Sequence, residues 1–259
     1  MRDTEAIAGN NSANEALGLD SVSKRFGELQ VLHDVDLSIP RNKACAIVGP
    51  SGCGKSTLLR LFNGLVEADS GVVRAFGEPV SEQALPQLCR RMGYAVQGTG
   101  LFPHMTAREN ITLAAHLGGW SEQRIDTRLQ ALFDLMHLDA DLLPRFPHEL
   151  SGGQQQRVGL CRAMMLEPEV LLLDEPFAAI DPITRHDIHR QLLEILEAEP
   201  VTVVLVTHDM REAMLLADRI VIMVGGAIAL DQAADELRDR YPGLEPEVLL
   251  QNLMREHGL

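Results

Sequence analysis

A predicted phosphate-binding loop is the strongest chemical signal in this sequence of 259 residues. Residues 49–57 read Gly-Pro-Ser-Gly-Cys-Gly-Lys-Ser-Thr, which matches the pattern of Gly, four residues, Gly-Lys and then Ser or Thr. The glycines let the backbone turn until several N–H groups point at one anion. We expect the Lys55 ammonium to reach the β- and γ-phosphates of a nucleotide and the Ser56 hydroxyl to bind Mg²⁺. The other expected nucleotide contacts in this loop are Gly49, Pro50, Ser51, Gly52, Cys53, Gly54 and Thr57.

Two carboxylates at the end of an apolar run form a second chemical signal. Residues 170–173 read Val-Leu-Leu-Leu, as in a buried strand, and Asp174 and Glu175 follow at once. Ligands of open α/β sheets gather at the carboxyl ends of the strands. We therefore expect Asp174 to hold Mg²⁺ through a water molecule and Glu175 to polarise the attacking water as a general base.

A further polar residue closes another predicted strand. Residues 201–206 are apolar and lead into Thr207 and His208. A single histidine is usually structural, but His208 falls at the same kind of strand end as the two acids. We therefore expect it to contact the γ-phosphate.

The elements around the phosphate loop are those that the motif requires. Residues 44–48, Ala-Cys-Ala-Ile-Val, predict a buried strand, and residues 57–62 predict a helix. A helix that begins at the loop directs the positive end of its dipole toward the anion. The alternative is a glycine-rich turn that binds nothing, and both flanking elements argue against it.

The middle of the chain predicts an inserted helical subdomain, at about residues 98–166. Strand signals are missing from residue 106 to about residue 147, and helical patterns take their place. Ser151, Gly152, Gly153 and Gln154 then open a helix with a serine N-cap, which offers either a second anion site or only a well-capped helix. The loop Gly98–Met105 carries Leu101 and Phe102, which favours contact with a partner.

Short strand patterns near the N-terminus predict an antiparallel sheet. They cover residues 19–22, 30–32 and 35–39, and residues 1–16 before them read as a loose arm without a signal-peptide core. Phe26 lies in this region. A single phenylalanine most often belongs to the core, although an aromatic ring near a nucleotide site can stack on a base.

Composition and charge exclude several classes of protein. With 23 basic and 37 acidic residues the net charge is −14, which opposes a general nucleic-acid binder. Apolar runs stay far short of 18 residues, so the sequence predicts no membrane-spanning helix. The four cysteines form no C-x-x-C pair, so neither a zinc site nor a disulfide is expected. Cys53 adjoins a predicted helix N-terminus and Lys55, which predicts a reactive thiol; an inert side chain is the alternative.

In their order, these motifs resemble the nucleotide-binding domains of ABC transporters. The phosphate loop, Gln97, the Leu150–Gln154 signature, the Leu171–Glu175 strand and His208 span nearly all of residues 17–225. Leu-Ser-Gly-Gly-Gln after a helical insert is the specific signal. The resemblance implies an α/β P-loop cassette with a RecA-like parallel-sheet core, an N-terminal antiparallel β subdomain and an inserted α-helical subdomain. The implied domain runs over residues 17–230, and residues 231–259 would form a short helical tail.

The same resemblance implies an ATPase that works as a head-to-tail homodimer. Each ATP, with Mg²⁺, would lie between the Lys55 loop of one chain and Ser151, Gly152, Gly153 and Gln154 of the other. Gln97 would bind Mg²⁺ and sense the γ-phosphate, Asp181 would link the two ATP sites, and Phe26 would stack on adenine. The loop Gly98–Met105 would dock on a membrane permease at the cytoplasmic face of the membrane.

Three stretches are most similar to importers of osmoprotectants such as glycine betaine, choline and related quaternary amines. They are residues 100–106, 151–159 and 181–185. In such importers a substrate-binding protein and the permease select the substrate, so this chain would supply only the energy. The alternatives are the ATPase of another importer, for example of amino acids, a half-exporter ATPase, or a soluble ABC protein acting on DNA or ribosomes. The charge of −14 opposes the last of these.

Overall fold

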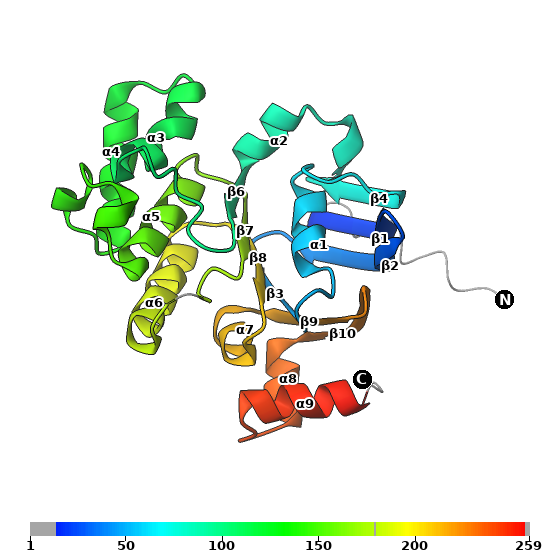
Figure 1. Cartoon of the computed structure of the whole chain (residues 1–259). Coiled ribbons are helices and arrows are strands. Elements are labelled where there is room, and N and C mark those ends of the chain that lie inside the picture. The colour runs from blue at the N-terminus through cyan, green and yellow to red at the C-terminus, as the bar shows by residue number, and fades with distance from the viewer. Residues whose placement is uncertain (1–13, 179, 257–259) are drawn as a thin grey trace. The chain divides into compact units, whose positions relative to one another are not determined.

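The computed structural model describes residues 14–178 and 180–256, which fall into two compact units. Unit 1 comprises the chain up to Leu88 together with the chain from His208 onward, and unit 2 comprises Cys89–Thr207. Figure 1 labels their helices and strands. Most of the predicted N-terminal arm lies outside the described residues. The predicted end of this arm at residue 16 was wrong, because strand β1 already begins at Glu15.

Unit 1 begins with an antiparallel sheet, as the sequence predicts. Strand β1 pairs with β2 and with β4, both antiparallel, and the first two strands are drawn in blue in Figure 1. Buried Val35, Leu37 and Ile39 alternate along β2 with exposed or half-buried positions, so one face of the sheet is packed and the other is open. The order is β2-β1-β4-β5, formed by β1 (Glu15–Phe26), β2 (Leu29–Pro40), β4 (Ser70–Ala75) and β5 (Glu78–Pro79).

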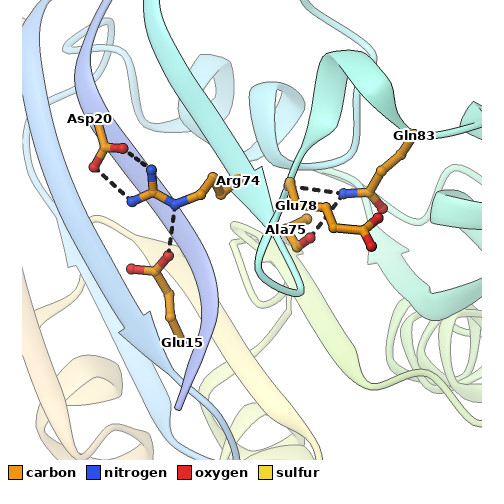
Figure 2. A network of polar contacts seen from close by, with 6 residues as sticks. All are labelled: Glu15, Asp20, Arg74, Ala75, Glu78 and Gln83. Atoms are coloured by element: carbon orange, nitrogen blue, oxygen red, sulfur yellow. Dashed lines mark hydrogen bonds and ion pairs between the residues drawn. The ribbon is translucent and has the colours of Figure 1, made fainter. Parts of the chain in front are cut away.

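Arg74 fastens the start of this sheet (Figure 2). Its Nε donates to Glu15 Oε1 at 3.2 Å, and its two terminal nitrogens donate to the Asp20 carboxylate, with 2.8 Å between Nη2 and Oδ1. Glu15 is only 6% exposed, and a buried carboxylate without a cation would be costly. The Arg74 guanidinium therefore links β4 to β1 at two points, at Glu15 where β1 begins and at Asp20 near its middle.

A second group of strands in unit 1 carries the phosphate loop. Strand β3 runs parallel to β9, with Cys45 opposite Arg219, and β10 pairs antiparallel with β9. Helix α1 follows β3, and α7 follows His208. The bounds are β3 (Ala44–Val48), α1 (Lys55–Phe62), α7 (Met210–Leu216), β9 (Arg219–Val224) and β10 (Ala227–Ala233), with the short η1 (Val80–Glu82) elsewhere in the unit.

The C-terminal helices belong to the core of unit 1. Helices α8 (Ala234–Arg240) and α9 (Pro246–Glu256) contribute Leu237, Leu249 and Leu253, each at most 2% exposed. These side chains share one cluster with residues of β3 and α7. The predicted boundary after residue 230 was wrong, because it falls within β10, and the helices beyond it pack into the same core as β3.

Unit 2 combines a parallel sheet with the predicted helical insert. Strand β7 runs parallel to both β6 and β8, and every residue of β7 and β8 is buried. Residues 96–169 are all described and contain helices but no strand, which agrees with the predicted insert. The strands are β6 (Met92–Ala95), β7 (Val170–Asp174) and β8 (Thr202–Thr207).

The helices of unit 2 begin at residues that suit their positions. Thr106 caps α3 by accepting from the Glu109 N–H, and the Glu109 carboxylate accepts from the Thr106 N–H, so the two form a capping box. The helices are α3 (Ala107–Leu117), α4 (Glu122–Leu135), η2 (Ala140–Leu142), η3 (Pro147–Glu149), α5 (Gly152–Met164) and α6 (Pro182–Ala198), while α2 (Leu85–Arg91) crosses the boundary between the units. In the part of the chain that the structure describes, no helix has both the length and the apolar character needed to span a bilayer.

The packing of α9 gives a stability prediction. Leu253→Ala should lower the free energy of unfolding by about 2–4 kcal/mol, because it leaves a cavity beside the residues of β3 and α7. Val248→Ala on the same helix is the matched control. Since Val248 is 43% exposed, its truncation should change stability by less than about 0.5 kcal/mol. Urea unfolding followed by circular dichroism measures both, and equal effects would show that α9 does not belong to the core.

Candidate nucleotide-binding site

The phosphate loop of unit 1 has a backbone that only glycine adopts readily. Gly52 has a φ of 80°, and Gly54, the N-cap of α1, has a φ of 104°. Packing adds a second requirement for glycine. A Cβ on Gly49 would lie 2.1 Å from the carbonyl oxygen of Met223 in β9, and one on Gly54 would lie 2.7 Å from Leu32 Cδ2 in β2. The loop is therefore pressed against two strands of its own unit.

Lys55 holds its ammonium group inside this loop. Its side-chain nitrogen donates to the carbonyl oxygens of Gly49 at 2.7 Å and Pro50 at 2.9 Å, and the residue is only 5% exposed. Pro50, Ser51 and Gly52 are exposed. The first turn of α1 contains no acidic residue, so nothing on the helix offsets the positive end of its dipole. Exposed peptide groups, a helix N-terminus and a held ammonium fit a polyphosphate.

The structure contradicts the prediction of a reactive Cys53. The residue is only 6% exposed, and its Sγ lies 4.0 Å from the Lys55 nitrogen. Burial raises the pKa of the Cys53 thiol above its usual value, and the opposing effect of the Lys55 charge is smaller. The sequence showed the neighbouring charge, but it did not show that the thiol is turned into the protein.

Phe26 is a surface residue and not part of the core. It ends β1 opposite Leu29, its side chain is 50% exposed, and the Lys24 nitrogen lies 5.3 Å from the centre of its ring. The hairpin that carries Phe26 is attached to the phosphate loop, because the carbonyl oxygen of Val31 and the side chain of Leu32 in β2 adjoin Gly54. An exposed ring on such a hairpin can stack on a base.

His208 and the phosphate loop belong to the same unit. His208 is exposed, directly follows β8 and precedes α7. The next residue, Asp209, caps α7 by accepting from the backbone N–H of Arg211 at 2.8 Å. This cap fixes the chain direction immediately after His208.

In unit 2 the structure brings Gln97 and Glu175 together. Gln97 Nε2 donates to Glu175 Oε2 at 3.2 Å. Asp174, the last residue of β7, is 2% exposed and accepts from the Tyr94 hydroxyl at 3.4 Å. Three residues that were predicted from two separate motifs therefore lie around the end of one strand, with carboxylate and amide oxygens of the type that Mg²⁺ prefers.

Glu175 has a backbone conformation that is unfavourable for a residue with a Cβ. Its φ is 48°, which costs about 1–2 kcal/mol for a non-glycine residue. The chain is held there by the Glu175 N–H, which donates to the carbonyl oxygen of Val206 at 2.9 Å. Strain of this kind persists where the surroundings fix it, and it is frequent at functional sites.

Tyr94 is a site residue that the sequence analysis missed. It lies on β6 opposite Leu172 of β7, and its hydroxyl reaches Asp174 from there. The only signal in the sequence was a tyrosine in the apolar run before Gln97. The sequence alone could not link Tyr94 to Asp174, because that link depends on the register between β6 and β7, which are far apart in the chain.

The signature residues form the start of α5. Ser151 Oγ accepts from the Gln154 N–H at 3.3 Å, and Gln154 Oε1 accepts from the Ser151 N–H at 2.9 Å. Among the described residues, nothing lies within 4 Å of a Cβ built on Gly152, whereas one on Gly153 would lie 2.4 Å from Thr184 Cγ2 in α6. Gly152 therefore leaves open space at the helix start, and Gly153 permits close packing of α6.

Asp181 and the loop Gly98–Met105 also have defined surroundings in unit 2. Asp181 is exposed, and its Oδ1 accepts from the Thr184 N–H at 3.0 Å at the start of α6. In the loop, Phe102 is 42% exposed, while Leu101 is half-buried. Asn110, which the sequence analysis also missed, donates to the carbonyl oxygens of Phe102 at 3.1 Å and Met105 at 3.0 Å.

Comparison with known proteins identifies the family. A family model described as ABC transporter matches residues 32–178, more than half of the chain. The chain belongs to the ABC transporter family. Glycine betaine uptake system ATP-binding protein YehX of Escherichia coli is 45% identical over 207 residues, which are 80% of this chain and 67% of the relative. Glycine betaine/carnitine/choline transport ATP-binding protein OpuCA of Bacillus subtilis is 43% identical over 222 residues, which are 85% of this chain and 58% of the relative.

The fold is that of ABC ATPase cassettes. A dimeric structure of the ATP-binding cassette MJ0796 bound to ADP and Pi is 30% identical, with a TM-score of 0.76, and the match covers 84% of this chain and 98% of that one. The predicted α/β cassette, with its antiparallel β region and helical insert, is therefore confirmed. This ABC chain spans only about three fifths to two thirds of the length of the curated relatives that it matches.

The burial of the cysteines predicts their order of alkylation. Cys89 is exposed and should react first, and the buried Cys53 should be slower. Cys45 and Cys161 should be slowest, since burial raises the pKa of each of these two thiols to about 12. Only the thiolate reacts, so below the thiol pKa the rate at Cys89 should rise about tenfold per pH unit. Mass spectrometry after brief alkylation between pH 7 and 9 measures this, with the urea-unfolded chain as control. Faster reaction at Cys53 than at Cys89 would contradict the geometry.

Proposed function

We propose that this ABC chain hydrolyses ATP to power the import of glycine betaine, choline or a related quaternary amine through a separate membrane permease. The observation that carries the chemical part is the gathering of Gln97, Asp174 and Glu175 around the end of β7. The substrate class is supported by relatives whose names specify glycine betaine, carnitine or choline transport at 43–45% identity.

The phosphate loop and Phe26 hold the nucleotide in this proposal. The backbone N–H groups of residues 49 and 51–54 and the start of α1, at Lys55–Thr57, face the phosphates. The Lys55 ammonium exchanges its carbonyl partners for phosphate oxygens. The exposed Phe26 ring stacks on the adenine, a contact worth about 1–3 kcal/mol for a stacked base.

Oxygen groups of Ser56, Asp174 and Gln97 hold Mg²⁺ in this proposal. Ser56 belongs to unit 1, and the other two residues belong to unit 2. When bound, the ion neutralises phosphate charge that develops during transfer. Asp174 suits this task because it is buried and oriented by Tyr94.

Glu175 acts as the general base in this proposal. Its carboxylate takes a proton from the water that attacks the γ-phosphate, and the Gln97 amide, 3.2 Å away, keeps it oriented. The strained backbone at Glu175 fixes the direction in which its side chain leaves β7. His208 contacts the γ-phosphate and completes the set of catalytic residues, which are Lys55, Gln97, Glu175 and His208.

A head-to-tail homodimer completes each ATP site in this proposal. The start of α5, where Ser151 and Gly152 are exposed and Gly153 and the capping Gln154 follow, would contact the nucleotide held by the partner subunit. Asp181, at the start of α6, would link the two ATP sites. Support comes from the dimeric structure of MJ0796, which has the same cassette fold.

The permease docks on the loop Gly98–Met105 at the cytoplasmic face of the membrane in this proposal. The loop offers Phe102, an exposed aromatic side chain held on a fixed backbone, as an anchor. A substrate-binding protein acts through the permease and not on this chain. The net charge of −14 opposes the alternative of a cassette that acts on nucleic acid.

Substitution of Glu175 tests the catalytic part of the proposal. Glu175→Gln should bind MgATP yet hydrolyse it about 10²–10⁴-fold more slowly, because the amide keeps the size of the side chain but is no base. It should accumulate as an ATP-bound dimer, which size-exclusion chromatography with MgATP detects beside a phosphate-release assay. Glu197→Gln, an exposed residue of α6, is the matched control and should behave as the parent.

Two outcomes of that experiment would contradict separate parts of the proposal. Turnover of Glu175→Gln at the rate of the parent would show that Glu175 is not the base. If Glu175→Gln turns over slowly but stays monomeric with MgATP, the assignment of Glu175 as the base stands and the shared-site dimer is rejected.

Uptake by cells tests the substrate class. Loss of the gene should abolish saturable uptake of labelled glycine betaine or choline, and the parent chain should restore it, whereas Glu175→Gln should not. Uptake of labelled amino acids in the same cells is the control. Normal quaternary-amine uptake combined with lost amino-acid uptake would instead support the alternative importer and would leave the ATPase assignment intact.

A further inference from the structure

One face of α5 holds the first half of the loop that we assign to permease docking. Gln155, Gly159 and Arg162 follow a spacing of four and three residues, which places them on the same side of a helix. All three adjoin Thr99. The helix that begins with the signature residues is thus also the support of the docking loop.

Arg162 makes the strongest of these contacts. Its Nη1 donates to the carbonyl oxygen of Gly100 at 2.7 Å, and its Nη2 donates to that of Thr99 at 3.2 Å. Its guanidinium carbon also lies 6.0 Å from the centre of the Phe102 ring. A planar cation that binds two successive carbonyl oxygens fixes the direction of the backbone as well as its position. Burial lowers the pKa of Arg162 from its usual value, which agrees with a guanidinium that the loop partly covers.

Gln155 connects the same loop to the signature. Its Oε1 accepts from the Thr99 hydroxyl at 3.4 Å, and its Nε2 donates to the carbonyl oxygens of Pro147 at 2.9 Å and Leu150 at 3.1 Å. Leu150 directly precedes Ser151. One amide side chain therefore contacts both the docking loop and the backbone from which the signature begins.

The second half of the loop is fixed by α3. Asn110, which is fully buried, accepts from the Phe102 N–H at 2.7 Å and donates to the carbonyl oxygens of Phe102 and Met105. The loop is therefore held at both halves by two helices of unit 2, α5 and α3. Phe102 can present its side chain outward because its backbone is held in this way.

We propose that Arg162 and Gln155 are positioning residues that couple the permease-docking loop to the ATP-contacting signature. A displacement of the start of α5 on nucleotide binding reaches Thr99 and Gly100 through these two side chains, because each contacts the loop from the signature helix. A contiguous chain of hydrogen bonds on one rigid element can carry such a displacement. The inference rests on the proposed function, since it needs ATP to bind at the signature.

Amide hydrogen exchange on the full chain tests the coupling. In the Glu175→Gln background, MgATP should slow amide exchange in residues 152–157, at the ATP contact, and also in residues 99–105. We expect the exchange rate in both segments to fall by about tenfold or more, which is the change in an equilibrium constant that one additional charge-assisted hydrogen bond gives. Arg162→Gln in the same background should keep the protection of residues 152–157 and lose that of residues 99–105. Arg162→Lys should retain part of it, since an ammonium can bind one carbonyl but not both as a fork.

Matched variants separate coupling from folding. Arg124→Gln removes the same charge from an exposed position on α4 and should leave the ATP effect in both segments unchanged. Gln155→Ala tests the second link and should reduce the effect in residues 99–105 by itself. If Arg162→Gln does not fold, Arg162→Lys and Gln155→Ala carry the test.

The outcomes distinguish the inference from the function on which it rests. Absence of ATP protection at residues 152–157 in the Glu175→Gln parent would overturn the proposed shared site and the coupling with it. Protection at residues 152–157 without any change at residues 99–105 would overturn the coupling alone. An equal ATP effect on residues 99–105 in the parent, Arg162→Gln and Gln155→Ala would also overturn it, whatever the thermal stability of the variants.

Discussion

The contact between Gly49 and the carbonyl oxygen of Met223 is the constraint on which unit 1 depends. The phosphate loop can follow its path only because its first residue lies directly against β9, where any side chain would clash. That approach requires β3 and β9 to be parallel neighbours in their observed register. It also requires the apolar cluster behind them, to which α7 and the C-terminal helices contribute. The conformation of the phosphate loop is therefore a consequence of core packing.

Unit 2 meets a different requirement, which is to orient two carboxylates and an amide around the end of one strand. Asp174 is buried, yet it keeps hydrogen-bond partners such as the Tyr94 hydroxyl, and Glu175 leaves the strand in a strained conformation that turns it toward Gln97. Hydrogen bonds of this kind fix the direction in which a carboxylate points, as a metal ligand or a base requires. The burial of β7 and β8 along their whole length stabilises the sheet and offsets the backbone strain at Glu175.

The sequence predicted those parts of the structure that local rules determine. The phosphate loop between a strand and a helix, the serine cap of α5 and the helical insert all follow from patterns within about twenty residues, and the structure has them. The features that the sequence analysis missed depend on contacts between residues that are far apart in the chain. Tyr94 meets Asp174 across 80 positions, and no single-sequence pattern gives the register that joins them. The burial of Cys53 and the packing of the tail into the core have the same origin, because a side chain's direction is decided by its neighbours in space.

The shared core of α9 and β3 also affects what could be attached to the protein. Leu249 and Leu253 belong to the same cluster as Val48, the residue immediately before the phosphate loop. A force or a binding event at the outer end of α9 would therefore act on the support of the nucleotide loop without touching the nucleotide. A domain fused after residue 256 would act on the apolar cluster that also contains Val48. Its linker length would then determine how strongly it acts, since a short, stiff linker transmits torque and a long, flexible one does not.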